Sequence, residues 1–372
     1  MSDVFFRDLG LREPHYYLAA GSGSHATQTS RVMTAFEPLA ERLRPDVVLV
    51  AGDVNSTLAC AIVTAKSGAL LGHIEAGLRS RDWSMPEEVN RVVTDRVSDY
   101  LFAPSPDAAA NLRAEGFRAD QIHLVGNVMV DTLLANVDRA RGSGTLERLH
   151  LTPRGYGLVT LHRAANVDDP AVLSRLMSAL ADVARLCPLV LPAHPRLTAR
   201  LAEAAGGSQA RDLRVIPAAG YLDFVALQAS ARLVLTDSGG VQEETTALGV
   251  PCLTLRDNTE RPITLTEGTN QLVGSDPDRI VAARSVLDVP PPARRPALWD
   301  GQAGRRIAAS LIAGGQVAEL LRPTSTPRSG GPLAGGALAD GALAAAGHAA
   351  AVRAVTAADA ADPARDTGQW MC

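Results

Sequence analysis

Strand-length apolar runs alternate with helix-length amphipathic segments along most of this chain, and this alternation constrains the fold more than any other feature. PDVVLVAG at 45–52 is typical of a buried strand, and ALLGHI at 69–74 of a second one. Between them, NSTLACAIVTAKSG at 55–68 is typical of a helix closed by Gly68 in the left-handed region. Strands that alternate with helices predict parallel sheets joined by crossover helices. Residues 1–145 therefore predict an α/β domain.

The alternation starts again after RGSGTLERLHLTPRG at 141–155, whose Gly, Ser and Pro content is typical of a linker between domains. The later strand candidates are GLVTLH, PLVLPAH, LRVIPA, ARLVLTD and VPCLTL. They predict a second doubly wound domain at 155–296. The stretch 323–372 is rich in Ala, Gly and Pro and poor in large apolar side chains, so we expect it to be disordered.

The composition of the 372 residues excludes several functional classes. A net charge of −4 argues against nucleic acid or an anionic membrane surface as a partner. No apolar run approaches the roughly 20 residues that span a bilayer, and the opening MSDVFFRDLG is too charged for a signal peptide. The four cysteines lack paired spacing, which favours a reducing cytoplasm over a disulfide framework or a Cys-based zinc site.

Polar residues follow five of the predicted strands directly. They are Asp53, Glu75, His162, His194 and Asp237. An Asp in this place is often a helix N-cap, and a lone His is often a packing residue. Because ligands of open α/β sheets bind outside the carboxyl ends of the strands, the shared position of the five favours a common cleft.

The segment LTDSGGVQEETTALG at 235–249 predicts an anion-binding site. Ser238, Gly239 and Gly240 lie between a strand and a helix, where free backbone N–H groups receive a phosphate without a lysine. We expect Glu243 and Glu244 in the first helical turn, where a carboxylate also accepts sugar hydroxyls. A simple N-cap is the alternative, but it does not need the glycine pair. The spacing matches neither a P-loop nor a dinucleotide loop.

The segment GHIEAGLRSRDWSMPEEVNR at 72–91 concentrates carboxylates and guanidinium groups. They are Glu75, Glu87, Glu88, Arg79, Arg81 and Arg91. One interpretation is a solvated loop held by surface ion pairs, each worth roughly 0 to 1 kcal/mol. The other is a wall of acid–base groups opposite the anion site, suited to a sugar with a phosphate leaving group. We find no nucleophile with an adjacent base and no metal-ligand spacing.

At these motifs the chain resembles the non-hydrolysing, bacterial UDP-N-acetylglucosamine 2-epimerase family. The matching stretches are AGDVNST, GHIEAGLRSRDWSMPEEVNR, VGNVMVDTL, VTLHRAANVDD, TDSGGVQEE, LRDNTERPIT, EGTNQLVG and LWDGQAGRRI, within residues 1–312. The resemblance implies a GT-B-like fold, with two Rossmann-like domains facing a cleft and a helix at 297–318 crossing back to the first. It implies reversible conversion of UDP-GlcNAc to UDP-ManNAc by anti elimination of UDP through a 2-acetamidoglucal, without a cofactor, in a homodimer.

Carried over by motif, Asp53, Glu75 and Glu87 match the catalytic carboxylates of the family. His162 matches the histidine beside the phosphates of the departing UDP. The chain has Ala165 where many members carry Glu in a His-Arg-x-Glu segment.

Ser238, Gly239 and Gly240 match the phosphate-binding turn, and Glu244 matches the residue that holds the ribose hydroxyls. Six further residues are expected to support these groups: Arg79, Arg91, Arg163, His194, Asp237 and Arg261.

The resemblance also places Met1 after an initial strand, helix and second strand of the family, so we expect the first domain to be incomplete at its N-terminus. Three functions follow. The first is the epimerase. The second is a UDP-sugar glycosyltransferase of the same fold, which has no need of the three carboxylates. The third is an inactive, truncated UDP-sugar-binding fragment.

Overall fold

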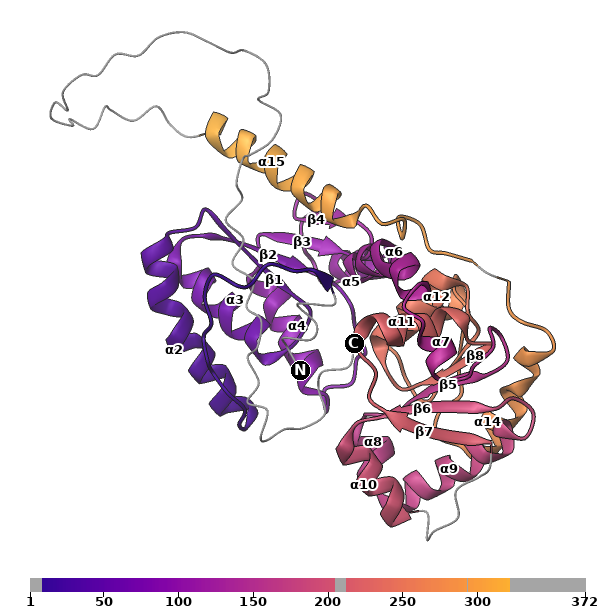
Figure 1. The fold of residues 1–372 in the computed structure, drawn as a ribbon. Helices are drawn as coiled ribbons and strands as arrows, with labels where there is room; N and C mark the ends of the chain where they lie inside the picture. The colour runs from indigo at the N-terminus through magenta and orange to yellow at the C-terminus, as the bar shows by residue number, and fades with distance from the viewer. Residues whose placement is uncertain (1–8, 205–211, 293, 322–372) are drawn as a thin grey trace, which may run out of the picture.

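Two parallel β-sheets form the framework of the molecule. The computed structural model describes residues 9–204, 212–292 and 294–321 (Figure 1). The first sheet has the strand order β1-β2-β3-β4 and the second the order β10-β9-β8-β5-β6-β7. All their pairings are parallel, from Val47↔Leu70 in the first sheet to Thr236↔Thr254 in the second. The predicted α/β class with parallel sheets is confirmed.

The first sheet and its helices come from the first part of the chain. Its elements are α2 (His25–Leu43), β1 (Val47–Ala51), α3 (Asn55–Ser67), β2 (Leu70–Ile74), α4 (Pro86–Val97), β3 (Tyr100–Ala103), α5 (Pro106–Ala114), β4 (Ile122–Leu124) and α6 (Val128–Arg141). The predicted strands at 45–52 and 69–74 and the helix at 55–68 are confirmed. Gly68 ends α3 with φ of 81°, a conformation that favours glycine.

The second sheet follows the short helix α7 in the chain. Its elements are α7 (Thr145–Arg148), β5 (Gly157–Thr160), α8 (Ala164–Val167), α9 (Pro170–Ala184), β6 (Leu189–Ala193), α10 (Pro195–Ala204), β7 (Leu213–Pro217), α11 (Tyr221–Ser230), β8 (Leu233–Thr236), α12 (Gly239–Leu248), β9 (Cys252–Thr254), α13 (Ile263–Thr266), β10 (Asn270–Leu272), α14 (Pro277–Ala283) and the 3₁₀ turn η1 (Arg284–Leu287). β5, β6 and β8 are buried on both faces, as expected for strands covered by helices.

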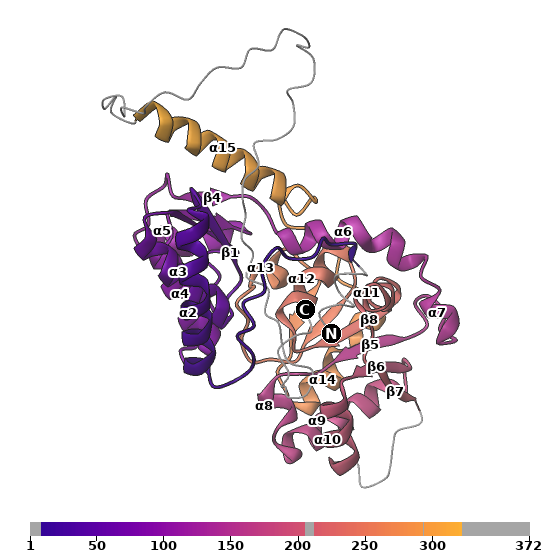
Figure 2. The same ribbon diagram turned by 60° about the vertical axis from the view of Figure 1, so that its left-hand side comes forward.

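Two helices connect the halves. Val130 and Leu133 of α6 share an apolar cluster with Val225 of α11 and the buried Trp299. The last helix, α15 (Ala303–Leu321), returns to the first sheet, where Ile307 packs with Phe102. Figures 1 and 2 show α15 along the β3–β4 side of that sheet in both views.

The structure adds two helices that the sequence interpretation placed in loops. α4 begins at Pro86 inside the charged segment, and α7 lies inside the predicted linker. α7 packs on α11, where Arg148 pairs with Asp223 at 2.7 Å. The domain boundaries at 145, 155 and 296 and the extent of the crossing helix stay predictions, and the predicted disordered tail at 323–372 lies outside the described residues.

Candidate active site

The five strand-end residues lie where the sequence placed them. Asp53 follows β1, Glu75 follows β2, and His162, His194 and Asp237 follow β5, β6 and β8. Because each sheet is parallel, the carboxyl ends of its strands share one edge. The two edges meet at Arg261, whose guanidinium lies 3.9 Å from the Glu75 carboxylate of the other sheet.

Arg91 on α4 binds two carboxylates of the first half, Asp53 after β1 and Glu88 on α4 itself. It donates to Asp53 through Nε at 3.1 Å and also through Nη2, and its Nη1 donates to Glu88 at 2.5 Å. Glu88 is buried and accepts the backbone N–H groups of Ser80 and Arg81, both at 2.9 Å. Asp53 keeps a quarter of its side chain exposed. Glu88 therefore fixes the loop, while Asp53 remains open to a ligand.

Glu75 combines an unusual backbone with an unusual charge environment. Its φ is 73°, a left-handed conformation that is rare for a residue with a side chain and that clusters at functional sites. Burial first, then the nearby charge of Glu243, raise the pKa of Glu75 to about 7, although Arg261 opposes them. A carboxyl with this pKa both gives and takes protons near neutral pH.

Glu87 lies in the first turn of α4, one position before the structural Glu88, and is half-buried. Its charge acts on Arg163 of the second half. Burial first and the neighbouring Arg256 lower the pKa of Arg163, while Glu260 and Glu87 oppose that change. The predicted carboxylate therefore faces a cation across the two halves.

The side chain of Arg79 makes its contacts in the interior of the first half. Its guanidinium pairs with the buried Asp95 at 2.7 Å and donates twice to Glu115, at 2.7 and 2.8 Å. It also donates to the Leu78 carbonyl at 2.7 Å. Arg79 thus supports the loop after β2 from below.

His162 is oriented by a buried aspartate. Its Nδ1 lies 2.8 Å from Asp237, which also accepts the backbone N–H of Arg163 and the Asn166 side chain, both at 3.0 Å. Burial opposes ionisation of Asp237, but His162 and these donors outweigh it and lower its pKa. Because Nδ1 is committed to Asp237, Nε2 is the ring atom available to a ligand.

Ser238, Gly239 and Gly240 form the start of α12, as predicted. Ser238 is the N-cap and accepts the N–H of Val241 at 3.4 Å. The first N–H groups of a helix have no acceptor inside it, so this turn presents donors to an anion. A Cβ at Gly239 would lie 2.4 Å from Nη1 of Arg261. The glycine therefore makes room for a guanidinium beside the turn.

The expectation that Glu243 and Glu244 lie in the first helical turn is wrong. The helix begins at Gly239, because Ser238 caps it, and this places both glutamates in the second turn, where they are buried. Burial first raises the pKa of Glu244 to about 8; a hydrogen bond to Gln228 opposes the change and Glu243 adds to it. Glu244 thus keeps a proton that it can donate.

Arg261 is the centre of a buried ionic cluster. Its Nε lies 2.9 Å from Glu243 and its Nη1 pairs with Glu260, which also binds Arg256 at 2.7 Å. Burial disfavours ionisation of Glu260, yet Arg261 and Arg256 hold its pKa far below the usual range. The sequence interpretation missed Glu260 and Arg256. The alternating charges of LRDNTERP after a predicted strand are a signal that could have identified them.

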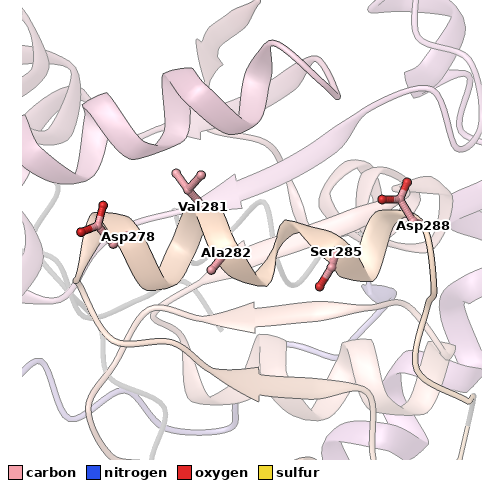
Figure 3. A pocket seen from close by; sticks show the side chains of 5 residues that line it. All are labelled: Asp278, Val281, Ala282, Ser285 and Asp288. Atoms are coloured by element: carbon pink, nitrogen blue, oxygen red, sulfur yellow. The ribbon is translucent and has the colours of Figure 1, made fainter.

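The remaining candidate features add little to this site. His194 is half-buried at the end of β6, and its supporting role stays a prediction. A shallow depression on α14 and η1 contains none of the predicted residues; Figure 3 shows its lining of Asp278, Val281, Ala282, Ser285 and Asp288. Within the described ranges, no group of three His, Cys, Asp or Glu residues could hold a metal ion. No helix in that part of the chain is long and apolar enough to cross a membrane.

The fold and the site define a class, a GT-B-like α/β protein with acidic groups on one sheet edge and the N-terminus of helix α12 on the other. The family described as UDP-N-acetylglucosamine 2-epimerase matches residues 1–312 of this chain. The chain therefore belongs to the UDP-N-acetylglucosamine 2-epimerase family, a family of enzymes.

Individual relatives support this membership. The UDP-N-acetylglucosamine 2-epimerase of Methanococcus maripaludis is 43% identical over 289 residues, which cover 76% of this chain and 79% of that protein. The UDP-2,3-diacetamido-2,3-dideoxy-D-glucuronate 2-epimerase of Pseudomonas aeruginosa is 42% identical over 315 residues, covering 84% and 87%. The crystal structure of the Methanocaldococcus jannaschii UDP-GlcNAc 2-epimerase in complex with UDP-GlcNAc and UDP has a TM-score of 0.78 at 39% identity, covering 84% and 88%.

Proposed function

We propose that this enzyme interconverts UDP-GlcNAc and UDP-ManNAc by inverting C2 of the sugar. One observation carries the proposal: Glu75, whose pKa is about 7, lies among Asp53, Glu243 and Arg261 where the two sheet edges meet. Removing a proton and returning one at the same site requires groups with different pKa values.

The reaction we propose has two halves. A carboxylate removes the C2 proton, the C–H electrons form a double bond between C1 and C2, and the C1–O bond breaks on the opposite face. UDP leaves with that bonding pair, and a 2-acetamidoglucal remains. UDP then adds back to C1 while C2 receives a proton on its other face. Asp53, Glu75 and Glu87 are the proposed proton-transfer groups.

The second sheet supplies the anion site in this proposal. The diphosphate would lie at the start of α12, against the N–H groups of Gly239 and Gly240, with Nε2 of His162 and the Arg261 guanidinium beside it. These donors are already oriented, so they stabilise the negative charge as it develops on UDP. Glu244 would hold the ribose hydroxyls.

A second substrate has a specific observation in its favour. The Pseudomonas aeruginosa relative, whose name specifies UDP-2,3-diacetamido-2,3-dideoxy-D-glucuronate, is as similar to this chain as those named for UDP-GlcNAc. Both substrates would undergo the same chemistry at C2, so the site accommodates either proposal. We place UDP-GlcNAc first because the M. jannaschii relative crystallised with it superposes on this chain.

The test incubates the chain with each UDP-sugar and separates the epimers by chromatography. We expect a new 2-epimer, and its loss in Asp53→Asn and Glu87→Gln with UDP affinity retained. Glu41→Gln, an exposed carboxylate on α2, is the matched control. Full turnover by both site variants would refute the catalytic roles, and transfer of the sugar to an acceptor without epimerisation would favour a glycosyltransferase.

Two further properties belong to the proposal. We propose a homodimer that works in the cytoplasm, and light scattering of the purified chain tests the oligomeric state. UDP binding without turnover of either sugar would instead favour an inactive UDP-sugar-binding protein.

A further inference from the structure

His73 lies in the interior of the first sheet, directly beneath the turns that carry Asp53 and Glu75. It is the fourth residue of β2 and is fully buried. Its Nδ1 lies 2.6 Å from Oδ1 of Asp95, and its Nε2 lies 2.8 Å from the Gly52 carbonyl oxygen. The ring therefore joins the backbone next to Asp53, through Nε2, to the buried carboxylate of Asp95, through Nδ1.

The two contacts determine the charge of the ring. A carboxylate oxygen and a carbonyl oxygen are both acceptors, and a neutral imidazole has only one N–H. The second contact of a neutral ring would place two lone pairs against each other in a buried environment, which is unfavourable. A doubly protonated ring satisfies both contacts, so the geometry favours the imidazolium.

The surrounding groups balance that charge. Asp95 pairs with His73 and also with Arg79 at 2.7 Å, and it accepts the N–H of Gly77 at 3.1 Å. Arg79 continues to Glu115 near the surface. Two cations and two carboxylates therefore alternate in one chain, which satisfies the condition for stable buried charges.

We propose that His73 is a positioning residue: as an imidazolium it ties the Gly52 carbonyl to Asp95 and so fixes the separation of Asp53 and Glu75. Gly52, with φ of 68°, immediately precedes Asp53, and Glu75 lies two residues after His73 with φ of 73°. Each turn is thus held from below by the same ring. This inference rests on the proposed function.

The imidazolium also acts on Glu75 by its charge. The groups that face Glu75 are Glu243 on α12, Arg261 after β9, Asp53 after β1 and His73 on β2. Removing the His73 charge removes one of the two cations in this set, so the pKa of Glu75 rises. The part of the kcat–pH profile that follows the titration of Glu75 must then move to higher pH. A purely structural defect would not produce this shift.

The first experiment does not depend on turnover. Ring-¹⁵N NMR of histidine-labelled protein near pH 8, with His73 assigned through His73→Gln, reports the protons on each nitrogen. We expect two protonated nitrogens. A single protonated nitrogen would overturn the inference while leaving the proposed function intact, whereas failure of the wild-type chain to turn over either UDP-sugar would count against the proposed function alone.

The second experiment measures kcat against pH for His73→Gln. We expect kcat to fall on the order of 10²-fold, as for a small misplacement of reacting groups, with UDP affinity unchanged and that part of the kcat–pH profile shifted to higher pH. His123→Gln, a matched change on β4, should alter none of these. Equal losses at every pH would overturn the inference. If His73→Gln does not fold, Asp95→Asn replaces it. In that variant we expect one protonated ring nitrogen on His73 and the same shift of the pH dependence of kcat to higher pH.

Discussion

Substitution of Glu75 by Gln tests the charge environment of the site through protein stability. Gln has nearly the same shape as Glu but carries no titrating proton. The pKa of Glu75 is raised to about 7 from an ordinary value of 4.5. The folded protein therefore binds more protons than the unfolded chain between these values, and its stability falls as pH rises through that window.

The magnitude follows from the two values. They differ by about 2.5, which corresponds to roughly 3 kcal/mol at most. The side chain is 13% exposed, so solvent screens little of this effect. Because the Gln variant lacks the ionisation, its stability relative to the wild type should be about 2 to 3 kcal/mol greater near pH 8 than near pH 5.

Urea unfolding at the two pH values measures this difference, provided that the m-values of the two proteins agree. Glu41→Gln serves as the control, since its carboxylate is exposed on α2. The variant should also lose turnover at every pH. The comparison is the stability of the Gln variant minus that of the wild type. If this difference is the same at both pH values, or greater near pH 5 than near pH 8, the charge environment described for Glu75 is refuted.

Three further predictions concern other parts of the site. Arg91→Met removes the counter-ion of the buried Glu88 and of the partly exposed Asp53, so thermal or urea unfolding should show a loss of about 3 kcal/mol. Unchanged stability would contradict the buried pairing. Gly239→Ala places a Cβ 2.4 Å from Arg261, so calorimetry should show roughly tenfold weaker UDP binding, and retained affinity would move the phosphate site elsewhere. Asp237→Asn removes the carboxylate that orients His162, so kcat should fall about 10- to 100-fold, and a normal rate would mean that the orientation is dispensable.

The strands were predictable because fully buried parallel strands leave continuous apolar runs in the sequence. α4 was not predicted, since its dense charges look like a loop. Pro86 followed by two glutamates was nevertheless a usable signal for a helix start. α7 was missed because four residues inside a Gly- and Pro-rich linker carry too little periodicity.

For the candidate site, the sequence predicted where the residues lie along the fold better than it predicted which side chains they contact. The strand ends located Asp53, Glu75 and His162, because their place follows from sheet topology alone. That Arg79 binds Asp95 and not the site, and that Arg261 reaches Glu75 from the other sheet, depends on packing between segments distant in sequence. No periodicity in the sequence encodes these contacts.

Proton exchange at C2 tests the central claim most directly. The chain is incubated with UDP-GlcNAc in D₂O and the C2 proton is followed by NMR. We predict that the C2 proton signal disappears as UDP-ManNAc forms, because the returning proton comes from a carboxyl that has exchanged with solvent. Epimer formation with the original proton retained at C2 would contradict the mechanism, and the absence of both exchange and epimer would contradict the proposed function of this chain.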